Sequence, residues 1–356
     1  MTKEPSVAPP SHAPSPRRKA AAVEWPTVAL IVACYAIWGA GLAVAAQSVG
    51  LSILLLTLAI AFHASLTHEV VHGHPTRHAW LNAAMVWPVI GLLVPFGRFR
   101  DTHLAHHQDA TLTDPYEDPE TNYLDPAVWV RLSPWQRVLL RANNTLLGRI
   151  VLGPVVGQIL FMAGDWHAIR KGNRAVRGAW VAHLPPLLVV GIIVLLAPVP
   201  LWAYAVAVWL GHGLVRIRTF LEHRAHGHAG GRTVVIEDQG PLALLFLNNN
   251  FHIVHHMHPA VPWYRLPGLY FSDVERYLRR NHGYRYRSYA DIFARYFLRA
   301  KDPVPHPLWP QPDGLTEAVP QRASPPAAGR PAPSFVGPLR AEPFAKVLPD
   351  PAPPQR

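Results

Sequence analysis

The residues with the clearest potential for chemistry are histidines in three short boxes. The boxes are residues 68–72 with the pattern HxxxH, and residues 103–107 and 252–256 with the pattern HxxHH. Spacings of three and four residues put side chains on one helical face, so each box can direct several imidazoles to one place. Imidazole is a common metal ligand. The candidate metal ligands in the boxes are His68, His72, His103, His106, His107, His252, His255 and His256.

The number of these histidines indicates more than one metal ion. With 21 histidines in 356 residues, chance gives ~0.07 HxxHH matches per chain, so a duplicate points to function. One zinc ion takes about four ligands, fewer than the boxes offer. Imidazole also suits iron, and the set fits two metal ions that share a site. Water-soluble di-iron bundles use paired Glu and ExxH motifs instead, and Glu69 with His72 makes a single ExxH.

The elements that carry the boxes are expected to be membrane helices. Half of the residues are hydrophobic and 15% are charged, against about 25% charged in a typical soluble domain. Apolar runs at about 27–46, from 51 into the first box, at 179–197 and at 201–215 predict four membrane spans in two hairpins. Basic residues before the first and third runs and after the fourth predict that both termini and the metal site are cytoplasmic.

Two further apolar stretches, at about 79–96 and 150–163, are read as re-entrant or interfacial segments. A single crossing at the first would put the first and second boxes on opposite sides of the membrane. The fold class is therefore an all-α integral membrane protein with four transmembrane helices, interfacial helices and a cytoplasmic helical cap that holds the metals. Residues 1–22 and 301–356 are rich in proline and are expected to be disordered tails around a membrane domain at 23–300.

In order and spacing, the boxes resemble those of the membrane fatty acid desaturase superfamily, which includes carotenoid hydroxylases and ketolases. The resemblance covers about residues 30–275. Residues 219–224 (TFLEHR) are similar to the place where such enzymes have one more metal-binding histidine, which implies His223 as a ninth ligand. At Thr219 relatives have an asparagine that helps to hold a metal-bound water, so Asn248 or Asn249 is a candidate substitute. Residues 258–267 (HPAVPWYRLP) look like the segment after the third box in bacterial carotenoid ketolases and related desaturases.

The resemblance implies an O2-dependent oxidoreductase with two non-haem iron ions that desaturates a fatty acyl lipid. Hydroxylation or ketolation of a lipid or carotenoid on the same scaffold is the alternative. No catalytic residue beyond the metal ligands and no other cofactor site is expected. The single cysteine, Cys34, excludes a cysteine-ligated iron–sulfur centre, so a separate electron donor such as a ferredoxin is implied.

The net charge of +11 does not form one basic patch interleaved with aromatic residues, so no nucleic-acid partner is expected. A basic rim that faces anionic lipid and an acidic electron carrier fits better. The expected location is the cytoplasmic membrane of a bacterium.

Carboxylates near the boxes are candidates for orienting the histidines, since a ligating imidazole normally donates its other N–H to such a group. Glu69 and Glu222 adjoin candidate ligands and are the leading pair. Further candidates are Asp101, Asp109, Asp114 and Asp238.

Two other functions are compatible with part of the pattern. Residues 68–72 also read as the HExxH motif of a zinc protease, which would leave six box histidines without a role. A metal transporter would place ionisable residues in mid-membrane, whereas His183 and His212 lie near the ends of their predicted spans. Two bound irons per chain would support the oxygenase, and one zinc the protease.

Overall fold

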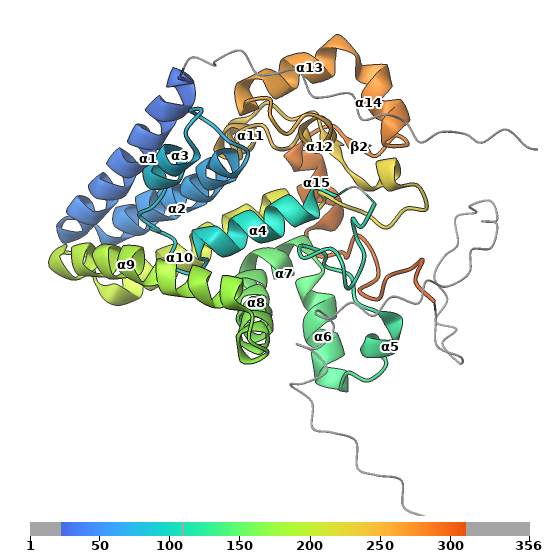
Figure 1. Cartoon of the computed structure of the whole chain (residues 1–356), viewed down its shortest axis with the longest axis horizontal. Coiled ribbons are helices and arrows are strands. Elements are labelled where there is room, and N and C mark those ends of the chain that lie inside the picture. The colour runs from blue at the N-terminus through green and yellow to red at the C-terminus, as the bar shows by residue number, and fades with distance from the viewer. Residues whose placement is uncertain (1–22, 109, 311–356) are drawn as a thin grey trace, which may run out of the picture.

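The computed structural model describes residues 23–108 and 110–310, and these residues form a mainly helical protein. Figure 1 shows the long helices α1, α2, α9 and α10 at one end and the short helices α11–α15 at the other, with α4 between them. The first half of the chain forms the helices α1 (Trp25–Ala43), η1 (Val44–Ala46), α2 (Val49–Val71), α3 (Ala79–Met85), α4 (Phe96–His106), α5 (Pro126–Trp129), α6 (Pro134–Asn143), α7 (Leu146–Val151) and α8 (Gly153–Arg170). The remaining elements are α9 (Arg174–Leu196), α10 (Leu201–Thr219), η2 (Ala229–Arg232), β1 (Val235–Ile236), α11 (Pro241–Leu245), α12 (His252–Met257), η3 (Trp263–Arg265), α13 (Leu266–Ser272), α14 (Val274–Arg280), β2 (Arg285–Tyr286) and α15 (Tyr289–Tyr296).

Three helical segments within the described residues are long and apolar enough to cross a membrane: Trp25–Ala46, Val49–Val71 and Arg174–Leu196. The first two form the predicted hairpin. The side chain of Ser48 caps α2 by accepting a hydrogen bond from the amide of Leu51 at 3.2 Å. The hydroxyl of Ser52 then donates to the Gly41 carbonyl at 2.7 Å and ties α2 to α1.

The fourth predicted span forms α10, which packs along α2. A Cβ atom at Gly211 would lie only 2.7 Å from Cγ2 of Ile60, so glycine is what allows this close approach. The last turns of α10 carry Arg216 and Arg218. This helix is not among the three candidate spans of the described chain, and the four-span topology stays a prediction.

The stretch at 79–96 is not one crossing helix, because α3 ends at Met85 and the chain is mostly non-helical until α4 begins. Side chains from the long helices satisfy its backbone carbonyls, as non-helical backbone inside a membrane protein requires. Four of the donor–acceptor pairs are Tyr204 Oη to Ile90 O at 2.7 Å, His212 Nε2 to Gly91 O at 3.0 Å, His183 Nε2 to Leu92 O at 2.8 Å and Gln158 Nε2 to Leu93 O at 2.9 Å. The two histidines considered for a transporter therefore act here as structural donors.

The folded part of the chain continues beyond residue 300, where the sequence placed the start of a tail. Val304 is buried in a hydrophobic cluster with Trp129, Leu132 and Leu140. Its carbonyl accepts a hydrogen bond from the amide of Leu124 at 3.0 Å. Residues 1–22 and 311–356, the rest of the predicted tails, lie outside the described residues.

Candidate metal centre

Three helices and one loop bring the nine candidate ligands together. His68 lies in the last turn of α2, and His72 is the residue that ends this helix. His103 and His106 lie in α4, with His107 at its end. The third box begins α12 and is buried, whereas His223 follows α10 in a loop that pairs with Thr233.

The nine histidines form two clusters in which the ligand nitrogen atoms lie within 4.8 Å of one another. The first histidine cluster comprises His68, His72, His103, His107 and His255. The second histidine cluster comprises His106, His223, His252 and His256. The first box thus belongs to one cluster, whereas the second and third boxes each contribute to both. Within these two boxes, adjacent histidines point in different directions and therefore reach different clusters.

Within the clusters, the imidazoles face one another through their Nε2 atoms. The Nε2–Nε2 distances in the first cluster are 2.9 Å for His72–His103, 3.0 Å for His103–His107 and 3.1 Å for His107–His255. Those in the second cluster are 2.8 Å for His106–His223 and 3.1 Å for His223–His252. Nitrogen atoms at these separations converge as ligands of one ion do, since metal–nitrogen bonds are about 2.0–2.1 Å long.

In three of the ligands the opposite ring nitrogen, Nδ1, has a partner that orients the ring. His106 Nδ1 lies 2.8 Å from Oδ1 of Asp118, and His103 Nδ1 lies 3.1 Å from Oε1 of Glu120. His252 Nδ1 lies 3.2 Å from Oδ1 of Asn249. A proton on Nδ1 leaves the Nε2 lone pair for a metal ion.

Asp118 and Glu120 were missed in the sequence. Both lie in the acidic segment Asp114–Glu120 after the second box, and the signal that could have found them is its density of carboxylates. Asp118 is the more buried of the two and also accepts hydrogen bonds from the backbone amides of Thr113 and Glu120. These two bonds fix the shape of the acidic loop, and the contact of Asp118 with His106 ties the loop to α4.

Of the two carboxylates predicted to orient ligands, Glu222 is the nearer to a histidine. Its Oε1 lies 3.9 Å from His252 Nδ1, 3.1 Å from Arg218 Nε and 3.2 Å from the Asn249 amide nitrogen. Glu69 is buried, and its Oε2 accepts a hydrogen bond from the backbone amide of Trp263 at 3.4 Å. The orienting role of both residues stays a prediction.

The four aspartates named beside them have other surroundings. Asp101 pairs with Arg100 at the surface, Asp114 accepts from backbone amides of its own loop, and Asp238 accepts from the amides of Gly240 and Tyr289. Asp109 lies outside the described residues.

Burial and crowding keep most of the clustered imidazoles neutral. Burial, with His103 and other neighbouring imidazoles, lowers the pKa of His72 to about 2. Burial and the neighbouring imidazoles of each ring also hold the pKa values of His107 and His255 well below the usual range. His106 is the exception: burial opposes its charge, but Glu120 and Asp118 outweigh burial and raise its pKa to about 9. A set of neutral imidazoles with nearby carboxylates is a suitable donor set for cations.

The residues present fit a pair of metal ions. The Nε2 atom of His68 is buried among the other rings of the first cluster, and no described residue gives it a hydrogen bond. A buried nitrogen without a partner is costly, and a shared ion would satisfy it. Five clustered imidazoles also exceed what a HExxH zinc site requires.

Other histidines near the boxes lie outside both clusters. The ring of His226 lies against the rings of His228 and His282 in a tilted arrangement, and its Nδ1 contacts the backbone of His228. His63 contacts the hydroxyl of Tyr35, and His74 pairs with Glu24.

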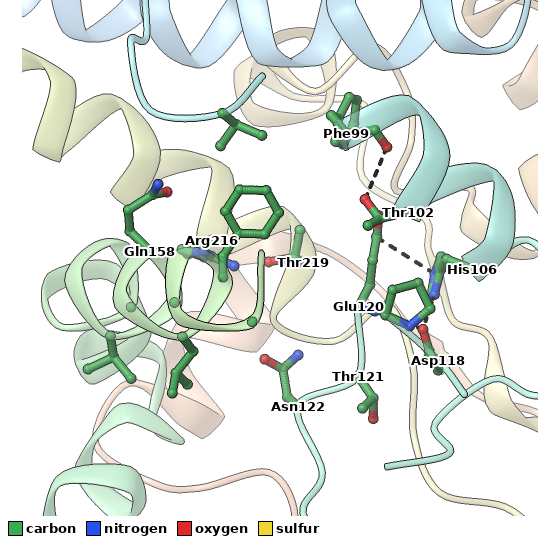
Figure 2. Close-up of a pocket in the computed structure, with 18 of the residues that line it drawn as sticks. Phe99, Thr102, His106, Asp118, Glu120, Thr121, Asn122, Gln158, Arg216 and Thr219 are labelled. Atoms are coloured by element: carbon green, nitrogen blue, oxygen red, sulfur yellow. Dashed lines mark hydrogen bonds and ion pairs between the residues drawn. The ribbon is translucent and has the colours of Figure 1, made fainter. Parts of the chain in front are cut away.

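A cavity of 780 Å³ adjoins the second histidine cluster. Its walls come from α2, α4, α7, α8, α10 and the acidic loop, and they include His106 and His223. Figure 2 shows His106, Asp118 and Glu120 on one side of this cavity and Arg216, Gln158 and Thr219 on the other. The volume is in the range of small-molecule sites.

Comparisons with known proteins agree with this site. A family model described as fatty acid desaturase matches residues 46–290, a range that contains all nine histidines. A β-carotene ketolase of Paracoccus sp. (strain N81106 / MBIC 01143) is 25% identical over 227 residues, which cover 62% of this chain and 77% of the ketolase. A β-carotene ketolase of Paracoccus sp. (strain PC1) is 26% identical over 223 residues, which cover 61% of this chain and 75% of the ketolase.

Proposed function

Because the chain belongs to the fatty acid desaturase family, we propose that it introduces a carbon–carbon double bond into the alkyl chain of a fatty acyl lipid. The family and the two histidine clusters make it a di-iron oxidoreductase of the membrane. The acyl substrate and the alkene product are the parts that we propose.

The nine clustered histidines would hold the two iron ions. The first histidine cluster would bind one ion and the second histidine cluster the other. When bound, the iron pair supplies the redox chemistry that uses dioxygen to remove hydrogen from an unactivated alkyl carbon. The surrounding protein keeps most of the histidine ligands neutral and orients their rings toward the ions.

Three side chains are proposed to position the ligand rings. Asp118, Glu120 and Asn249 each hold the Nδ1 atom of a different histidine, so that Nε2 faces the ions. Glu222 supports Asn249 by accepting a hydrogen bond from its amide group. Two consecutive hydrogen bonds thus fix the orientation of His252.

The observation that carries the proposal is the cavity beside the second histidine cluster. Its walls offer apolar side chains such as Ile60, Val89 and Leu160, which suit an alkyl chain. His106 and His223 lie in the same wall. An alkyl chain in this cavity would therefore lie close to the metal ligands, and its placement would decide which carbon reacts.

The site is proposed to face the cytoplasm of a bacterial cell. The start of α1 meets the end of α2, where the amide of Glu24 donates to the Pro75 carbonyl at 3.0 Å. The end of α10 also leads directly to the metal site, and arginines lie there and before α9. Basic residues favour the cytoplasmic side. We further propose four spans, both termini on that side, and a separate electron donor such as a ferredoxin.

Ketolation or hydroxylation of a carotenoid is the second candidate. It is favoured by the similarity to two proteins named β-carotene ketolase. The same ligands would serve this reaction, because only the position of the substrate and the fate of the oxidised carbon differ.

Expression in a host with a compatible electron donor, followed by mass spectrometry of lipids and carotenoids, tests the two functions. An acyl chain that has lost two hydrogens supports desaturation, and a carotenoid that has gained oxygen supports the second candidate. His256→Ala should abolish the product. His258→Ala is a matched control, because His258 follows the third box but lies outside both clusters. If cells contain iron-loaded protein and a working donor but form neither product, this result contradicts both functions.

A further inference from the structure

Two arginines on the wall of the cavity lack an anionic partner. Arg149 in α7 is 6% exposed, and Arg216 in α10 reaches toward the cavity centre in Figure 2. The Nη1 atom of Arg149 donates to the side chain of Asn122, but its buried Nε has no partner. Among residues 23–108 and 110–310, no carboxylate lies within ion-pairing distance of either arginine.

The fold makes a specific recess for these two side chains. A Cβ atom at Gly157 would lie 2.5 Å from Nη2 of Arg216. A Cβ atom at Gly153, one helical turn earlier in α8, would lie 3.2 Å from Cδ of Arg149 and 3.4 Å from Cγ of Arg216. The two glycines therefore place both arginines against the same face of α8.

Placing two like charges together in a buried recess is unfavourable without an anion. Burial and the neighbouring Arg216 lower the pKa of Arg149 to about 9, which leaves the guanidinium charged at neutral pH. The carboxylates that line the cavity have nearer partners than the two arginines. Glu120 contacts His103, Glu222 contacts Arg218, Asp165 pairs with Arg98 and Asp302 pairs with Lys301, while Asp101, Asp118 and Asp125 contact Arg100, His106 and Tyr116. Glu120 and Glu222 act on Arg216 only from a distance, so neither guanidinium of the recess has a carboxylate in ion-pair contact.

We propose that Arg149 and Arg216 bind the anionic end group of an amphiphilic substrate, a carboxylate or a phosphate monoester, whose alkyl chain lies in the cavity beside the second histidine cluster. Guanidinium groups bind such oxyanions with charge-assisted hydrogen bonds. The assignment rests on the proposed acyl oxidation and narrows its substrate to an anionic amphiphile. A neutral hydrocarbon such as a carotene would leave both charges unpaired.

Equilibrium binding to the purified, metal-loaded protein in a neutral detergent tests the assignment without relying on turnover. Radiolabelled palmitate is the probe, and the competitors are unlabelled palmitate, hexadecyl phosphate, methyl palmitate and β-carotene. One of the two anions should compete at least about tenfold better than methyl palmitate, and the better anion identifies the end group. Equal competition by palmitate, hexadecyl phosphate and methyl palmitate, or best competition by β-carotene, would overturn the assignment.

Variants locate the binding group. Arg216→Met and Arg149→Met should each weaken binding of the preferred anion by about tenfold or more and leave methyl palmitate unaffected, while Arg216→Lys should be intermediate. Arg279→Met is the control, since Arg279 is exposed on α14 and does not line the cavity. Unchanged anion binding in both Met variants would refute the site. If a variant does not fold, the ligand preference of the unmodified protein still decides.

The outcome is separable from the proposed function. Anion-selective binding by a protein that does not oxidise lipids would keep the arginine site and reject the desaturase. Oxidation of lipids by a protein that binds the ester as well as the acid would keep the desaturase and reject the arginine site.

Discussion

Replacing Asp118 by asparagine should weaken one metal site and spare the other. Oδ1 of Asp118 lies 2.8 Å from Nδ1 of His106 and accepts from the Glu120 amide at 2.9 Å, whereas Oδ2 accepts from the Thr113 amide at 2.9 Å. Asparagine has one acceptor oxygen, so its amide group must face at least one of these donors. Because His106 belongs only to the second histidine cluster, the first should be unaffected.

The size of the effect follows from the loss of a buried partner of a metal ligand. Such losses weaken metal binding by about 10–100-fold, which corresponds to about 1.4–2.8 kcal/mol. The unsatisfied buried amide adds about 1–3 kcal/mol to the loss of folding stability. Both changes should be measurable in purified protein.

The assay is titration of chelator-stripped protein with Co²⁺, followed by its visible absorption. The unmodified protein should bind two ions, and Asp118→Asn should bind one normally and the other about 10–100-fold more weakly. Asp114→Asn is the matched control, because Asp114 lies in the same loop but accepts only from the amides of Tyr116 and Glu117. If Asp118→Asn binds both ions with unchanged affinity, Asp118 does not position His106.

Three further changes test the ligands and the bundle. His106→Ala should abolish turnover and lower the iron content without preventing membrane insertion, and unchanged activity in the product assay would show that His106 is not a ligand. Tyr204→Phe should lower the free energy of unfolding by about 2–5 kcal/mol, because the Ile90 carbonyl and the Trp38 indole both lose their partner; a melting temperature equal to that of the parent would contradict this. Gly211→Ala should lower the free energy of unfolding by about 1–3 kcal/mol, because the added methyl group pushes α10 away from Ile60 on α2. Thermal unfolding in detergent would detect this loss, and a variant as stable as the parent would mean that the two helices can separate freely.

The amino-acid sequence alone was enough to predict a histidine-rich metal centre and the helices that carry much of it. The two HxxHH boxes predict imidazoles on one helical face, and the structure has His103 and His106 in one helix and the third box at the start of another. The long apolar runs predict α1, α2 and α9 because backbone hydrogen bonding and bilayer thickness leave few other structures for them. The interruption of residues 79–96 was also predictable, since shared metals require boxes on one side.

The division of the histidines between the two clusters, and the side chains next to them, could be seen only in the three-dimensional fold. His106 and His107 adjoin in sequence but belong to different clusters, because neighbouring helical side chains differ by about a quarter turn in direction. The density of carboxylates marks the segment that contains Asp118 and Glu120, but no sequence pattern assigns these residues or the arginines at the cavity to particular histidines. They meet at the site because the acidic loop and helices from distant parts of the chain pack around one cavity, and such long-range packing cannot be read from the local sequence.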